Sequence, residues 1–328
     1  MAGLIVKSLK AVSHPAVLPS CRSAILGAAL VAAVPWTVPR TPWGDPDLRG
    51  TYSNDNEYAM PLERPDEFAG KRASDMTPAE LAEIRRNARQ KMIAALPGGD
   101  VRGPDSWWLE NLDLTRRSRP WAVVDPPDGK IPALTPAGAA RSAGRVRSSF
   151  LGGPFDSPED FNFLERCITK SVPGAMIPSM YSNNYEIVQA PGLVAIRYEL
   201  LHEQRLIPLD GRPHVGAKIR QHLGDSRGRF ERNTLVVETT NFKQASAYRN
   251  ADASTLRVVE RFTPRSKDTL EWTARIEDPK TWTEAWTIAQ DLTRDRGGLL
   301  FYECHENNYG LLNILRGARA TDGRQDNR

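Results

Sequence analysis

The sequence has no hydrophobic run long enough to cross a membrane, which needs about 20 consecutive apolar residues. Its most apolar stretch is Ala24–Val34, which follows basic side chains and no acidic one. A basic stretch before a short apolar run that ends in small residues is typical of a secretory signal peptide. We therefore predict a signal peptide over residues 1–34, cleaved near Ala33. The mature chain should be periplasmic or secreted, with no integral membrane segment.

Cysteine is scarce, with three residues in the whole chain. Cys21 lies in the predicted leader, so Cys167 and Cys304 are the two that the mature chain keeps. Two cysteines in an exported chain favour one disulfide over free thiols. We predict a Cys167–Cys304 bridge. Two buried thiols, or one catalytic thiol, are the alternatives.

Neither sign of charge is in large excess. The chain has 44 Lys and Arg against 40 Asp and Glu, a formal net charge of +4. The two signs are interspersed, without the basic block that would follow a phosphate backbone. Nucleic acid is therefore not an expected partner.

The signatures of the common cofactor enzymes are also missing. The sequence has no phosphate loop, dinucleotide fingerprint, Gly-x-Ser-x-Gly elbow, HExxH or CxxC. These absences argue against nucleotide, nicotinamide and ordinary triad chemistry, and we expect no cofactor. No two histidines of the mature chain are paired four residues apart on a predicted helix, so no metal site is predicted. The histidines concerned are His202, His214, His222 and His305.

The N-terminal part of the mature chain, residues 35–160, is rich in proline and glycine and shows little periodicity. Two helix starts stand out, because Thr followed by Pro supplies an N-cap and a first helical residue. They lie at Thr77–Pro78 and Thr135–Pro136. Short strands are expected at Thr51–Ser53 and from Val123 into a turn. We interpret 35–160 as an extended, partly helical segment that wraps around the main domain.

From about residue 161 onward, short segments alternate apolar and polar residues with period two, between turn residues. This pattern is typical of antiparallel strands. The predicted strands are 185–189, 193–199, 205–209, 234–240, 256–262, 269–277, 282–287 and 299–304, and an amphipathic helix follows at 309–320. We predict a mainly β (α+β) domain over 161–328, a curved antiparallel sheet or lipocalin-like barrel of about eight strands. Such a barrel has room for one small ligand.

Two segments carry distinctive motifs. Leu223–Phe242 reads LGDSRGRFERNTLVVETTNF, and Glu303–Gly310 reads ECHENNYG. Together with Pro39–Leu48, they resemble a large family of exported proteins of Acidobacteria and Proteobacteria, notably of sphingomonad type. The resemblance implies export and a shared fold, and it implies no particular reaction. The sequence departs from the family at His222 and Phe230, where tryptophan is more usual.

The polar residues after Cys304 form the first candidate site. If Cys304 is bridged, His305 is held at a predicted strand end, on the same face as Glu303. An oriented histidine beside a carboxylate suits general acid–base catalysis, and Glu306 is a second candidate for it. The alternative is that Glu306 caps the following helix and His305 is exposed.

The second candidate site joins Arg220, Asp225 and Glu238. Residues 224–228 read as a tight polar turn, in which Asp225 and Arg227 form a structural clamp or contact a substrate. Arg220 would hold a substrate oxygen. If Glu238 faces into an apolar barrel, desolvation raises its carboxyl pKa towards catalytic use.

A predicted hairpin and two tryptophans form the third candidate site. Its polar residues are Asn184, Tyr185, Tyr198 and His202, for which structural roles are the alternative. Trp272 and Trp286 are expected in the core or barrel wall, or as an aromatic lining for an apolar ligand.

These features favour a metal-independent and cofactor-independent enzyme that acts on a small, largely apolar or ring-containing molecule. Lyase, isomerase, cyclase or hydratase chemistry would need proton transfer alone. The proton-handling candidates are His305, Glu306, Glu238 and His202, and Arg220 and Asn184 would bind a substrate oxygen. One alternative is a non-enzymatic periplasmic carrier of an apolar ligand. Another is a structural role in assembly of the cell envelope.

Overall fold

The computed structural model describes residues 36–58, 60–94, 118–143, 155–179, 181–306 and 308–325. The predicted signal peptide over residues 1–34 lies outside these ranges. No helix within them has the length and apolar character needed to cross a membrane.

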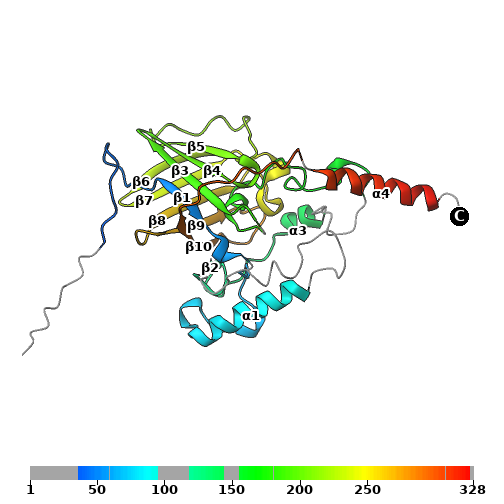
Figure 1. The fold of residues 1–328 in the computed structure, drawn as a ribbon, viewed down its shortest axis with the longest axis horizontal. Coiled ribbons are helices and arrows are strands. Elements are labelled where there is room, and N and C mark those ends of the chain that lie inside the picture. The colour runs from blue at the N-terminus through cyan, green and yellow to red at the C-terminus, as the bar shows by residue number, and fades with distance from the viewer. Residues whose placement is uncertain are drawn as a thin grey trace, which may run out of the picture. The chain divides into compact units, whose positions relative to one another are not determined.

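Ten strands form one curved antiparallel sheet, shown in Figure 1. The strands are β1 (Gly50–Ser53), β2 (Val123–Asp125), β3 (Asn184–Ala190), β4 (Leu193–Tyr198), β5 (Gln204–Pro208), β6 (Asp225–Glu231), β7 (Thr234–Thr240), β8 (Arg257–Pro264), β9 (Thr269–Glu277) and β10 (Trp286–Asp295). Their order is β5-β4-β3-β1-β10-β9-β8-β7-β6, and β2 pairs with β10 beside this path. The prediction of a mainly β, antiparallel fold is confirmed.

The sheet curls until its two end strands, β5 and β6, pack against one another. A Cβ atom on Gly228 of β6 would lie only 2.7 Å from side-chain atoms of Ile207 and of Leu209, which are on and just after β5. No backbone ladder joins the two strands, so hydrogen bonds do not close the sheet into a barrel. Side-chain packing alone covers this seam, and glycine at 228 is what allows the close approach.

Alternation along the strands fills the inside of the curve. In β9, Leu270, Trp272, Ala274 and Ile276 are buried, and the residues between them are less so. Large side chains from β4 and β8 to β10 complete this core, among them Tyr198, Phe262 and Trp286. Burying one such side chain contributes about 1.5–3 kcal/mol, so the core dominates the stability of the sheet.

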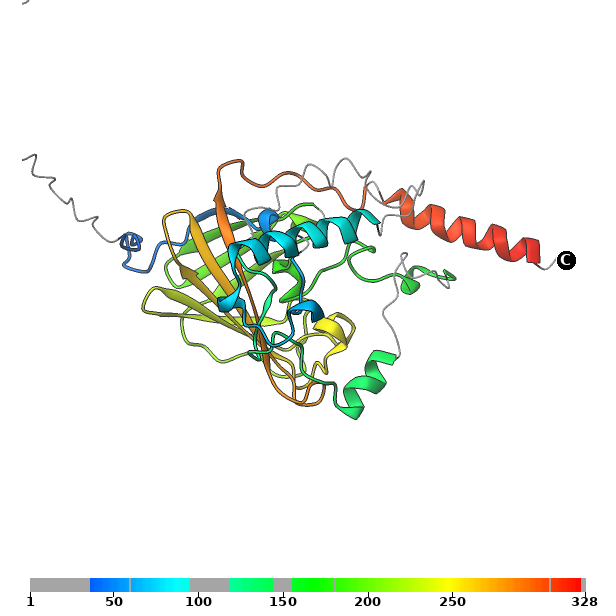
Figure 2. The ribbon, with the colours of Figure 1, turned by 90° about the horizontal axis from the view of Figure 1, so that it is seen from below.

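The N-terminal segment contributes to the sheet as well as wrapping around it. β1 lies between β3 and β10, in the middle of the strand order. Helix α1 (Pro78–Ala94) begins with a reciprocal cap, because the Thr77 hydroxyl accepts the Glu80 N–H at 3.3 Å and the Glu80 carboxylate accepts the Thr77 N–H at 2.8 Å. Helix α3 (Pro136–Ala143) also follows a threonine cap. Both predicted helix starts are confirmed, and Figure 2 shows the two helices outside the sheet.

Two predicted elements are wrong. Residues 225–231 form strand β6, although 224–228 read as a turn. Residues 299–303 form no strand, and their apolar side chains Leu300 and Phe301 are 69% and 77% exposed. The last strand is instead β10, which starts near the end of the predicted strand 282–287 and runs further. Helix α4 (Tyr309–Gln325) confirms the predicted C-terminal helix.

Candidate functional site

A loop of residues 169–178, which we call the plug loop, fills one end of the curved sheet. Val172, Ala175 and Met176 of this loop belong to the buried core. The Met176 carbonyl accepts hydrogen bonds from the Asn54 side-chain amide at 2.8 Å and from the Gln290 side-chain amide. These contacts fix the plug loop to the segment after β1 and to β10.

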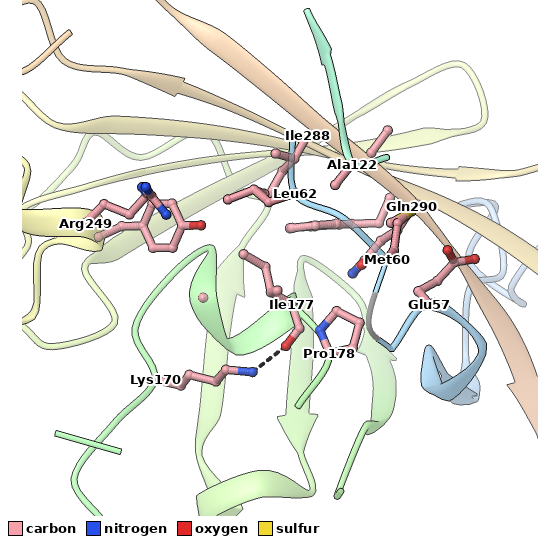
Figure 3. A pocket seen from close by; sticks show the side chains of 14 residues that line it. Glu57, Met60, Leu62, Ala122, Lys170, Ile177, Pro178, Arg249, Ile288 and Gln290 are labelled. Carbon is pink, nitrogen blue, oxygen red and sulfur yellow. Dashed lines mark hydrogen bonds between the residues drawn. The ribbon is translucent and has the colours of Figure 1, made fainter. Parts of the chain in front are cut away.

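A cavity of about 350 Å³ lies between the plug loop and the sheet, and we call it the Trp272 cavity. Figure 3 shows side chains of the sheet, such as Ile288, facing side chains of the plug loop, such as Ile177. The lining residues are Glu57, Met60, Leu62, Ala122, Lys170, Gly174, Ile177, Pro178, Tyr248, Arg249, Trp272, Ile288, Ala289 and Gln290. Apolar walls with a few polar groups, at this volume, are typical of small-molecule sites.

Lys170 is the principal charged group of the plug loop at this cavity. Its Nζ donates to the Ser179 hydroxyl at 2.6 Å and to the Ile177 carbonyl. Burial lowers the pKa of Lys170 to about 8, because the ammonium loses its hydration. Burial likewise raises the pKa of the Tyr248 hydroxyl to about 12. Lys170 was not predicted as a site residue, because it lies in a loop with no periodic pattern.

Of the two predicted aromatic residues, one lines the cavity. This residue is Trp272, whose indole N–H donates to Glu260 at 3.0 Å. Trp286 is buried nearby, edge-on to Trp282 at 5.5 Å and 6.3 Å from the ring of the lining residue Tyr248. It belongs to the core wall behind the cavity.

An ion pair inside the sheet was missed by sequence reasoning. Arg205 of β5 and Glu260 of β8 are 3% and 0% exposed at their side chains and lie 2.6 Å apart. Glu260 is in phase with the apolar residues Val258 and Phe262, so its inward position could have been found from alternation. The inward position of Arg205 was harder to predict, because both faces of β5 carry a large aliphatic side chain. Ile207, on the same face as Arg205, is buried, whereas Leu206, on the opposite face, is exposed.

The predicted hairpin cluster is held together by structural contacts. The Tyr185 hydroxyl donates to Asn54 at 3.0 Å, and the Asn184 amide donates to Glu199 at 2.8 Å. Tyr198 is buried edge-on to Tyr185, and burial raises the pKa of its hydroxyl. None of these side chains lines the Trp272 cavity.

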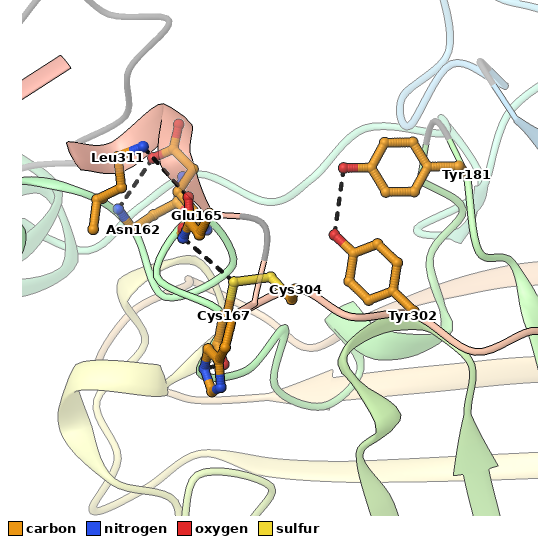
Figure 4. The surroundings of a disulfide bond; sticks show 9 residues. Asn162, Glu165, Cys167, Tyr181, Tyr302, Cys304 and Leu311 are labelled. Carbon is orange, nitrogen blue, oxygen red and sulfur yellow. Dashed lines mark hydrogen bonds between the residues drawn. A yellow bond between two sulfur atoms is a disulfide. The ribbon is translucent and has the colours of Figure 1, made fainter. Parts of the chain in front are cut away.

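The Cys167–Cys304 disulfide is present, with 5.7 Å between the two Cα atoms, which confirms that prediction (Figure 4). It lies beside a second, more open cleft of about 660 Å³. His305 is exposed, with its Nε2 2.8 Å from the Cys167 carbonyl, and Glu306 is exposed too. Neither residue lines a cavity described above.

His202 is the remaining histidine among the proton-handling candidates, and it contacts the segment before the disulfide. Its Nε2 accepts the backbone N–H of Tyr302 at 2.8 Å, and its ring lies 4.8 Å from that of Phe301. The imidazole is thus engaged in fixing the chain after β10 to the turn after β4.

Glu238 lies on the outer face of the sheet, so the expectation of an inward carboxylate is wrong. It pairs with Val259, whereas the inward residue beside it, Val237, pairs with Glu260. A hydrogen bond from Arg257 lowers the pKa of Glu238, which is the opposite of the expected shift. Successive residues of a strand point to opposite faces, so choosing the wrong face for β7 placed Glu238 inside in place of its neighbour Val237.

Asp225 and Arg220 also make structural contacts. Asp225 accepts from His214 at 2.8 Å and from Arg227 at 2.7 Å, which is the clamp considered from the sequence. Arg220 donates to the carbonyls of Phe242 and Ala253 at 3.2 and 2.7 Å. In the described parts of the chain, His, Cys, Asp and Glu side chains nowhere gather in threes that could hold a metal ion.

No family model matches the sequence, and no curated protein matches it. Among solved structures, a fold comparison finds a secretary abundant heat soluble (SAHS) protein from Ramazzottius varieornatus. The TM-score is 0.23 and the identity 10%, over 34% of this chain and 70% of that protein. Similarity this low says nothing about the function of the chain.

Proposed function

We propose that the protein binds a small, largely apolar molecule in the Trp272 cavity and acts as an exported carrier or binding protein. The observation that carries the proposal is the cavity itself, with its mainly apolar lining between the plug loop and the sheet. The few polar groups that would orient a ligand come from Glu57, Lys170, Tyr248, Arg249 and Gln290.

Export supports this role. The disulfide between Cys167 and Cys304 is of the kind that forms and persists in oxidising compartments. We propose that residues 1–34 are a signal peptide, and that the chain belongs to the exported family that its motifs resemble. Intact-mass measurement of the periplasmic fraction should show a chain that starts close to Val34. Full-length protein in the cytosol would contradict export.

A second candidate function is the metal-independent acid–base enzyme expected from the sequence, of lyase, isomerase, cyclase or hydratase type. One observation favours it: Lys170 lies at an apolar cavity with its pKa lowered to about 8, where a side chain can both give and accept a proton near neutral pH. In this version the proton-handling group is Lys170, because His305, Glu306, Glu238 and His202 lie away from the Trp272 cavity.

The experiment that tests ligand binding is native mass spectrometry of the mature protein, purified from the periplasm of its own host. The expected result is a protein mass raised by one bound small molecule, released by organic solvent and retained in buffer. Once that molecule is identified, its conversion by the protein separates the two functions, since an enzyme would convert it and a carrier would not. A mass that equals the bare chain, together with no uptake of an added apolar probe, would contradict both functions.

A further inference from the structure

We propose that Lys170 forms a reversible imine with ligands that carry a carbonyl group, so that the Trp272 cavity selects small apolar aldehydes and ketones. This inference rests on the proposed function, because it uses the same cavity. It adds the chemical class of the ligand and a covalent step, which a simple apolar binding site would not have.

The placement of the amine is the first support. Lys170 is the one lysine among the residues that line the cavity; the other cation there, Arg249, is a guanidinium and does not form simple imines. Figure 3 shows the Lys170 side chain running along the plug loop to the Ile177 carbonyl, beside Pro178. The amine therefore lies at the wall of an apolar space that can hold the body of the ligand.

The plug loop holds this amine in place. The loop begins just after Cys167, which the disulfide ties to Cys304. The backbone N–H of Lys170 donates to Glu203 at 3.2 Å, and the Ser171 hydroxyl donates to the His222 carbonyl at 3.3 Å. With both its backbone and its Nζ fixed, the lysine loses little further freedom when a ligand binds, which favours reaction.

The ionisation of Lys170 supports the same conclusion. An amine attacks a carbonyl only in its neutral form. With its pKa lowered to about 8, about a tenth of Lys170 is neutral at pH 7, whereas an exposed lysine is neutral in only about three molecules in ten thousand. Two other charged side chains, Glu57 and Arg249, line the cavity, and Glu203 accepts the Lys170 backbone N–H.

The reaction needs no redox partner. The Lys170 nitrogen adds to the carbonyl carbon, the carbonyl oxygen takes up protons, and water leaves as the C=N bond forms. The two hydrogens that the neutral amine loses depart in that water. The Ser179 hydroxyl, 2.6 Å from Nζ, is placed to carry a proton away from the attacking nitrogen. Hydrolysis by the reverse steps releases the ligand unchanged.

The test compares cinnamaldehyde with cinnamyl alcohol, which has the same apolar body and no carbonyl. The oxidised mature protein is incubated with each at pH 7, treated with borohydride, and digested for peptide mapping. The aldehyde should leave a reduced adduct on Lys170, formed at least about ten times faster than on exposed lysines such as Lys218 and Lys267. The alcohol should bind without any adduct.

Two variants serve as a matched pair. Lys170→Met should lose the fast adduct, while Lys218→Met, at an exposed site, should keep both the adduct and alcohol binding. Circular dichroism of each variant confirms folding. Adducts that are spread over surface lysines, or that survive in Lys170→Met, would overturn the imine. If cinnamyl alcohol binds and the aldehyde is not trapped, the imine proposal fails and the binding function stands. If neither compound displaces an apolar probe from the cavity, the binding function fails as well.

Discussion

Arg205 and Glu260 meet inside the curve of the sheet at 2.6 Å, although β5 and β8 lie far apart in the strand order. Their contact therefore shows that the sheet curls strongly enough to bring β5 and β8 face to face. Glu260 also accepts the indole N–H of Trp272, a residue that lines the cavity. The buried charges thus hold one wall of the proposed ligand site.

Removal of one buried charge should be costly. In Arg205→Met, Glu260 stays buried without its cation, and we expect a loss of about 3–5 kcal/mol in the free energy of unfolding. The double variant Arg205→Met with Glu260→Met should lose much less, because no charge is then left unpaired. Urea unfolding curves of the three proteins measure both differences. As a control, Arg197→Met breaks the exposed Arg197–Glu186 pair and should cost less than about 1 kcal/mol. Equal losses for Arg205→Met and Arg197→Met would contradict a buried pair.

The disulfide should contribute strongly to stability, since it links residues 137 apart in sequence. Replacement of Cys167 and Cys304 by serine should lower the free energy of unfolding by about 2–5 kcal/mol. Because the plug loop starts next to Cys167, the same variant should bind an apolar probe more weakly. Chemical denaturation and probe titration give the two readings, and wild-type protein treated with reductant should behave like the variant. An unchanged unfolding midpoint would contradict the assignment.

Lys170 should make the stability depend on pH in a defined direction. Between about pH 8 and its ordinary value of 10.5, Lys170 is neutral in the folded protein and still protonated in the unfolded chain. The unfolded state then binds more protons, so the free energy of unfolding rises with pH through this window. Compared with Lys170→Met, wild type should gain up to about 3 kcal/mol between pH 7 and pH 10.5. A stability difference that stays constant over this range would show that the amine is not desolvated.

His305 belongs to the candidate site predicted after Cys304, and it does not line the Trp272 cavity. The side chain is exposed and makes one hydrogen bond, to the Cys167 carbonyl. His305→Ala should therefore lower stability by no more than about 1 kcal/mol and leave binding of an apolar probe unchanged. Thermal unfolding and fluorescence titration are the two measurements. A large loss of affinity with normal stability would place His305 in the site after all.

Elements with strong alternation were predictable. β7 and β9 have the predicted bounds: β9 alternates cleanly, β7 holds a short run of apolar residues, and both are flanked by turn residues. β6 was missed because two of its three inward residues, Ser226 and Gly228, carry almost no apolar signal, and Gly228 is required by the close approach of β5. The opposite error occurred at Leu299–Phe301, where an apolar run predicted a strand but lies at the surface.

The site was less predictable than the fold. Its walls come from the segment after β1, the plug loop, the turn before β8, and strands β9 and β10, which only the finished topology brings together. Polar motifs near Cys304 and Asp225 attracted attention because they are dense in functional groups. In the structure, His305 contacts the Cys167 carbonyl, and Asp225 accepts hydrogen bonds from His214 and Arg227. Trp272 was found, because a large aromatic on the apolar face of a strand points to the interior.

The most direct test of the central claim is to fill the Trp272 cavity. A Cβ atom on Gly174, a lining residue of the cavity, would meet Tyr248 and Lys170 at ordinary contact distances of 3.7 and 3.8 Å, so the backbone there tolerates a side chain. Gly216 faces open space and provides the matched control. Titration with N-phenyl-1-naphthylamine should show one site in wild type and in Gly216→Leu, and at least about tenfold weaker binding in Gly174→Leu, with all three proteins equally folded. Equal affinity in the three proteins would contradict ligand binding in this cavity.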